Sequence, residues 1–208
     1  MQLRASLWIL VMGVAAATSF HADVVDRVMA VVGGQAITWS DVRAARALRL
    51  VSTPAGASDA DVLDRLVSRE VMRAEVDRFS VAPLEAADID RRVAAARAQL
   101  AGPDRTAALD ALGMSEPRLR AWLEDDSRID RYVQQRFDVA AQPTDEEVLT
   151  YFQSREREFV KNGQPQPFAS AQAEARARLV ADRRQQLIDE WVATLRRRAA
   201  VVLIPAGS

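Results

Sequence analysis

Two clusters of carboxylates are the residues of this sequence whose spacing could support acid–base chemistry. The run Glu124 to Asp126 could supply the pair of carboxylates that hydrolyses a glycosidic bond when the two groups face each other across a substrate. Consecutive helical residues point to different faces, so this run is better interpreted as a solvated helix surface. The run Asp145 to Glu147 follows Thr144 at a predicted helix start, where negative charge complements the helix dipole. Neither cluster predicts a catalytic pair.

The sequence lacks the residues needed for nucleophilic or zinc chemistry. It has no cysteine, and its single histidine, His21, precedes the predicted mature chain, so neither a Ser-His-Asp triad nor the usual nitrogen and sulfur zinc ligands can form. No calcium-loop spacing is present, and the pair Gly33-Gly34 lacks the Lys-Ser/Thr of a phosphate-binding loop. We therefore expect a protein that binds rather than an enzyme, with no cofactor and no metal.

The first 22 residues predict a secretory signal. Arg4 provides the positive start, Leu7 to Ala17 form the apolar run, and small residues up to Ala22 offer cleavage sites. The run is shorter than the roughly 20 apolar residues that span a bilayer, although an uncleaved anchor is the alternative. We expect a cleaved, exported protein without stable membrane insertion. The 28 basic and 29 acidic residues of the full sequence nearly cancel, which does not favour nucleic acid as a partner.

Short β-strands are predicted at both ends of the mature chain. The stretch Val24 to Thr38 (VVDRVMAVVGGQAIT) is rich in β-branched residues and contains a Gly-Gly turn, which indicates a hairpin. The closing stretch AVVLIPAGS contains a further strand, stopped by Pro205. A two-stranded hairpin is marginally stable alone, so we expect the last strand to join it in one antiparallel sheet. This predicts a mainly α fold in which residues 23–208 form one domain, with 23–159 completed by 168–204.

The chain between these strands reads as helices. Serines at positions 40, 58 and 115 are expected to cap three of them, the first of which should run to about Val51. Residues 160–167 (VKNGQPQP) predict a loop. A single helix of roughly 30 residues should follow from Phe168.

These features resemble the chaperone module of SurA-type periplasmic chaperones and related parvulin-class foldases. The resemblance rests on VVDRVMAVVGGQAITWSDV, followed by the helices and by PTDEEVLTYFQSREREF, which match the N-terminal part of that module. It rests also on the long last helix with its terminal strand, which match the C-terminal segment that completes the module. In that family a parvulin prolyl isomerase domain is inserted where this chain has only VKNGQPQP. The resemblance implies an ATP-independent chaperone without isomerase activity, whose partners are unfolded exported polypeptides, typically outer membrane protein precursors.

Six large side chains near charged residues are the candidates for contact with such clients. They are Met114, Leu119, Trp122, Tyr132, Tyr151 and Phe152. Core packing is the alternative for each, because aromatic residues at helical spacing usually face inward. Trp39 and Trp191 are expected in the core.

The sequence is also compatible with two other functions and with a homodimer. An accessory module for one folded envelope partner would share this fold and differ only in selectivity. A minimal prolyl isomerase is the other possibility. Exchange of the long last helix between two copies would produce a homodimer.

Overall fold

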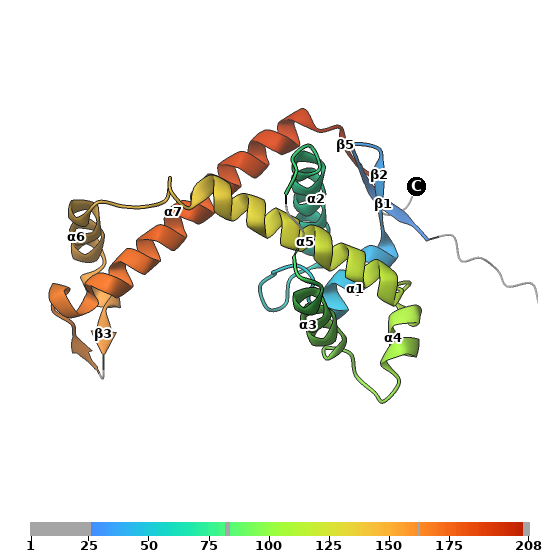
Figure 1. The fold of residues 1–208 in the computed structure, drawn as a ribbon, viewed down its shortest axis with the longest axis horizontal. Helices are drawn as coiled ribbons and strands as arrows, with labels where there is room; N and C mark the ends of the chain where they lie inside the picture. The colour runs from blue at the N-terminus through green and yellow to red at the C-terminus, as the bar shows by residue number, and fades with distance from the viewer. Residues whose placement is uncertain (1–25, 82–83, 162, 206–208) are drawn as a thin grey trace, which may run out of the picture.

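The computed structural model describes residues 26–81, 84–161 and 163–205, and the predicted signal lies outside these ranges. The chain is mainly helical and carries a small antiparallel sheet, which confirms the predicted fold class (Figure 1). In chain order the elements are β1 (Val28–Val32), β2 (Gln35–Thr38), α1 (Trp39–Ala47), α2 (Asp59–Val76), α3 (Ala86–Arg97), α4 (Arg105–Ala111), α5 (Glu116–Phe137), α6 (Asp145–Ser154), the 3-10 turn η1 (Glu156–Glu158), β3 (Val160–Lys161), β4 (Gln164–Pro165), α7 (Phe168–Arg198) and β5 (Val201–Leu203).

The sheet joins the two ends of the described chain. Its strand order is β2-β1-β5, and both pairings are antiparallel. The turn between β1 and β2 needs positive φ at both central residues, and Gly33 (φ 56°) and Gly34 (φ 89°) adopt it without the steric penalty of a Cβ atom. In the second pairing Val31 lies opposite Val202. The predicted hairpin and the predicted third strand are both confirmed.

The start and the end of α1 differ from the sequence prediction. Thr38, not Ser40, caps the helix, because its side chain accepts from the Asp41 backbone while the Asp41 carboxylate accepts from the Thr38 backbone N–H at 2.8 Å. Ser40 instead donates its backbone N–H to Asp26 at 3.1 Å. The helix ends at Ala47 rather than near Val51, and the chain then turns through Arg49, whose φ of 52° is left-handed.

The other predicted elements follow the sequence more closely. Ser58 and Ser115 cap α2 and α5 as predicted, and α7 is one helix of 31 residues. The stretch predicted as a loop contains the short hairpin of β3 and β4, in which Val160 lies opposite Pro165. Gly163, at φ 78°, forms part of its turn.

Helix α7 connects two parts of the molecule. Figure 1 shows it running diagonally from the sheet to the far end of the molecule, where α6 and β3 lie. We call α6, η1, the β3–β4 hairpin and the first half of α7 the distal lobe; its buried residues, including Phe152 and Phe159, form a hydrophobic cluster of their own. The remaining elements form the body, which holds two further clusters. The second half of α7 packs on the body through Trp191 and Leu195.

Candidate functional site

The six side chains predicted to contact clients lie in three different hydrophobic clusters. Met114 and Leu119 are fully buried against α3 and α4, Tyr132 packs against Trp191, and Tyr151 and Phe152 lie inside the distal lobe. Trp122 alone is only half-buried. The structure therefore does not bring the six together on one surface. Five of them occupy the core positions that their helical spacing also allowed, and a client would reach them only if the clusters opened.

The two tryptophans expected in the core differ in burial. Trp191 is buried and meets the Phe137 ring edge-on, with ring centroids 5.8 Å apart. Trp39 is half-buried; it packs against the edge of the body's main cluster and carries the Arg27 guanidinium 5.5 Å above its ring. The prediction is confirmed for Trp191 and holds only in part for Trp39.

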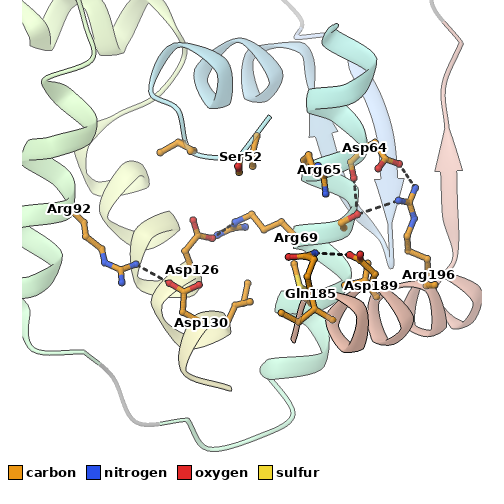
Figure 2. Close-up of a pocket in the computed structure, with 18 residues that line it drawn as sticks. Ser52, Asp64, Arg65, Arg69, Arg92, Asp126, Asp130, Gln185, Asp189 and Arg196 are labelled. Atoms are coloured by element: carbon orange, nitrogen blue, oxygen red, sulfur yellow. Dashed lines mark hydrogen bonds and ion pairs between the residues drawn. The ribbon is translucent and has the colours of Figure 1, made fainter. Parts of the chain in front are cut away.

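A large hollow lies elsewhere, between α2, α5 and the second half of α7 (Figure 2). We call it the groove; its volume is about 700 Å³, and the loop after α1 and one residue of α3 complete its walls. Its apolar floor consists of Leu50, Val51, Met72, Ile129, Ile188 and Val192. All but Ile129 are only partly buried, so aliphatic surface is accessible there. Sequence reasoning missed this site because its residues are far apart along the chain.

A network of three side chains supports one side of the groove; Arg69 is buried, and Trp122 and Asp126 are half-buried. The Arg69 guanidinium lies 3.6 Å from the centroid of the Trp122 ring, and its Nε donates to Asp126 at 2.6 Å. Trp122 Nε1 donates to the other oxygen of the same carboxylate at 3.1 Å, and Arg69 also donates to the Trp122 carbonyl at 3.0 Å. Arg69 thus neutralises Asp126 and fixes the position of the indole ring.

Burial dominates the protonation of Asp126. It raises the pKa of this carboxyl above its ordinary value, and the charge and hydrogen bond of Arg69 oppose the rise only in part. The folded state therefore binds this proton more tightly than the unfolded chain does. The network depends on Arg69 remaining beside the carboxylate.

Ion pairs between different helices form the rim of the groove. Arg92 of α3 contacts Asp130 of α5 at 3.2 Å, and Arg196 of α7 contacts Asp64 of α2 at 2.6 Å. Arg196 also donates to the Ser68 hydroxyl at 3.2 Å. Exposed pairs of this kind contribute little stability individually, but they hold charged groups at defined positions around the aliphatic floor.

The carboxylate clusters of the sequence serve structural purposes. Glu147 pairs with Arg183 of α7 at 2.5 Å and accepts from the Thr144 backbone, and these two contacts lower the pKa of Glu147 to about 2. Asp125 contacts Arg128 at 3.4 Å, whereas Asp126 belongs to the network described above. Across residues 26–81, 84–161 and 163–205, no group of three or more histidine, cysteine or acidic side chains is arranged to hold a metal ion. Among the same residues, no helix is both long and apolar enough to cross a membrane.

Comparison with known proteins gives a relationship in structure but none in sequence. Neither a protein-family model nor a curated protein sequence matches this chain. The structure is similar to a solved chain from work on the virulence factor PEB4 and the periplasmic protein Cj1289, two structurally related SurA-like chaperones of Campylobacter jejuni. The TM-score is 0.54 at 12% sequence identity, and the match covers 87% of this chain and 100% of the other. This protein therefore has a SurA-like fold.

Proposed function

We propose that this protein is a periplasmic, ATP-independent chaperone that binds unfolded or partly folded exported polypeptides, including outer membrane protein precursors. The fold shared with the SurA-like chaperones of Campylobacter jejuni is the observation that carries the proposal. The predicted export signal, residues 1–22, agrees with this location. No prolyl isomerase activity is proposed, because the chain has only residues 160–167 where the related foldases carry their catalytic domain.

The groove is the surface that we assign to clients. Its floor offers partly exposed aliphatic side chains, of which Ile188 and Val192 lie one turn apart on α7. An unfolded chain presents aliphatic side chains that can fill such a floor, and no reaction is needed to release them. The six residues first proposed from the sequence remain candidates only for a state in which the buried clusters have opened.

A light-scattering assay tests the proposal. An outer membrane protein diluted from urea should aggregate less when the full mature protein is present in several-fold excess without nucleotide. Ile188→Asp and Val192→Asp, each checked for folding by circular dichroism, should reduce this protection. Leu149→Asp places the same charge on an exposed position of α6 in the distal lobe and should leave the protection unchanged.

Three outcomes would contradict the proposal. Aggregation that is unchanged at several-fold excess would rule out a general holding activity. Recovery of one stoichiometric folded protein from an envelope extract, in place of many unfolded precursors, would favour a dedicated accessory module. Acceleration of cis-trans isomerisation in a prolyl peptide assay would contradict the expected lack of isomerase activity.

A further inference from the structure

The charged side chains that line the groove do not all have partners. Four arginines and four aspartates line it, namely Arg65, Arg69, Arg92, Arg196, Asp64, Asp126, Asp130 and Asp189. Three pairs form among them: Arg69 with Asp126, Arg92 with Asp130, and Arg196 with Asp64. One cation, Arg65, and one anion, Asp189, are therefore in no ion pair within the described residues.

Arg65 is an exposed cation on α2. It makes no hydrogen bond and no ion pair with any residue in the described ranges. One turn earlier, the Asp61 carboxylate accepts from the Ser58 backbone and from the Ser58 hydroxyl, each at 2.7 Å. These hydrogen bonds lower the pKa of Asp61, and the charge of Arg65 contributes only through space, without a direct contact. Figure 2 shows Arg65 beside Asp64, whose carboxylate is paired with Arg196. The guanidinium of Arg65 is therefore available to a carboxylate that enters the groove.

Asp189 is an exposed anion on α7. Its carboxylate accepts one hydrogen bond, from the neutral Gln185 amide at 2.8 Å, and contacts no arginine in the part of the chain that the structure describes (Figure 2). Asp189 directly follows Ile188 of the apolar floor, so a basic side chain beside a bound aliphatic group would lie near it. The groove thus combines an aliphatic floor with one charged group of each sign that forms no ion pair within the described residues, on two different helices.

From this pattern we infer that the groove selects polypeptide segments in which aliphatic side chains are flanked by an acidic residue toward Arg65 and a basic residue toward Asp189. The inference rests on the proposed function and specifies the chemistry of the bound segment. A neutral aliphatic segment fills the same floor but leaves both charges facing water. Each exposed contact should change the dissociation constant by about 2- to 5-fold, and salt should weaken the preference.

Fluorescence anisotropy with short labelled peptides tests the inference on the full mature protein. One peptide carries alternating valines with an aspartate near one end and an arginine near the other, and its neutral counterpart carries asparagine and glutamine at those positions. The charged peptide should bind about 5- to 10-fold more tightly at low salt, and 0.5 M salt should remove most of the difference. Arg65→Gln should reduce the preference for the acidic end, and Asp189→Asn the preference for the basic end.

Two substitutions on α4 serve as matched controls. Arg105→Gln and Asp110→Asn remove the same charges at exposed positions outside the groove and should leave both affinities unchanged. Equal binding of the charged and neutral peptides, or equal effects of the groove and control substitutions, would overturn the inference while leaving the proposed function standing. Loss of all peptide binding together with loss of protection in the scattering assay would instead contradict the proposed function.

Discussion

Replacement of Arg69 by methionine tests the network of Arg69, Trp122 and Asp126 at one side of the groove. The side chain of Arg69 is 9% exposed and that of its partner Asp126 is 22% exposed, so the substitution leaves a largely buried carboxylate without its cation. Breaking a fully buried pair costs about 3–5 kcal/mol. The destabilisation caused by the unpaired carboxylate cannot exceed about 4 kcal/mol at pH 7, because the folded protein could instead protonate it, and protonating a group with an ordinary pKa of 3.8 costs that much.

Because Asp126 is partly exposed, we expect its unpaired carboxylate to lower the free energy of unfolding by less than this upper limit. We expect Arg69→Met to lower the free energy of unfolding by about 3 kcal/mol at pH 7, of which roughly 1 kcal/mol comes from the lost stacking of the guanidinium on Trp122. The loss should depend on pH. Without Arg69 the pKa of Asp126 rises further, so the folded state binds the proton more tightly than the unfolded chain, and the penalty shrinks as pH falls toward 3.8. At pH 4.5 we expect a loss of about 2 kcal/mol.

Urea unfolding at pH 7 and pH 4.5, followed by circular dichroism, measures both values. The double variant with Arg69→Met and Asp126→Asn no longer has a carboxylate at position 126, so its free energy of unfolding should be lower than that of the native protein by about 1 kcal/mol at pH 7. Arg105→Met, at an exposed position on α4, should change stability by less than about 0.5 kcal/mol. A loss for Arg69→Met that is equal at both pH values, or a double variant as unstable as the single one, would refute the reasoning.

Three further predictions concern the sheet and the helix caps. The backbone hydrogen bonds from Gly33 N to Ala200 O and from Ile204 N to Met29 O imply that the backbone N–H of Val202 also points toward β1. Val202→Pro removes this donor and should lower the free energy of unfolding in urea by about 1–3 kcal/mol. The N–H of Leu203 points away from the sheet, so Leu203→Pro should lower it by less than about 1 kcal/mol. The pKa of Glu147 is lowered to about 2, so its stabilising contribution is complete above its ordinary pKa of 4.5 and is lost as pH falls toward 2. Glu147→Gln should therefore make the thermal unfolding midpoint less dependent on pH between 4.5 and 2, whereas Glu146→Gln should leave that dependence unchanged. Thr38→Ala should destabilise the protein by about 1 kcal/mol in the same urea assay, because it removes the cap of α1, and an unchanged midpoint would contradict that assignment.

Much of the fold could be predicted from local sequence patterns. The β-branched runs at both ends, the pair Gly33-Gly34 and the preference for pairing a lone strand were enough to predict the sheet. The cap of α1 was misplaced because Thr38 and Ser40 are both good capping residues, and only the backbone shows which of them faces the Asp41 amide. The β3–β4 hairpin was missed because strands of two residues have too little alternation to be recognised, although Asn-Gly at 162–163 is a hairpin signal.

The candidate site was much less accessible to sequence reasoning. Helical spacing marks a side chain such as Leu119 or Tyr151 as part of an apolar stripe, but it does not distinguish a stripe that faces the core from one that faces a partner. The groove depends on tertiary arrangement, because Leu50, Met72 and Ile188 lie on three separate segments. The charges left unpaired in it are identified only after the ion pairs between helices are known.

Site-specific crosslinking tests the assignment of clients to the groove most directly. The chain has no cysteine, so a single cysteine can carry a photoreactive group at any chosen position without further substitution. Ser52→Cys and Gln185→Cys place the group at exposed positions in the groove, whereas Asp110→Cys and Leu149→Cys place it on α4 and α6. With an unfolded outer membrane protein as client, the account predicts strong crosslinks from the two groove positions and weak ones from the other two. Equal crosslinking from all four positions, or stronger crosslinking from α4 or α6, would contradict it.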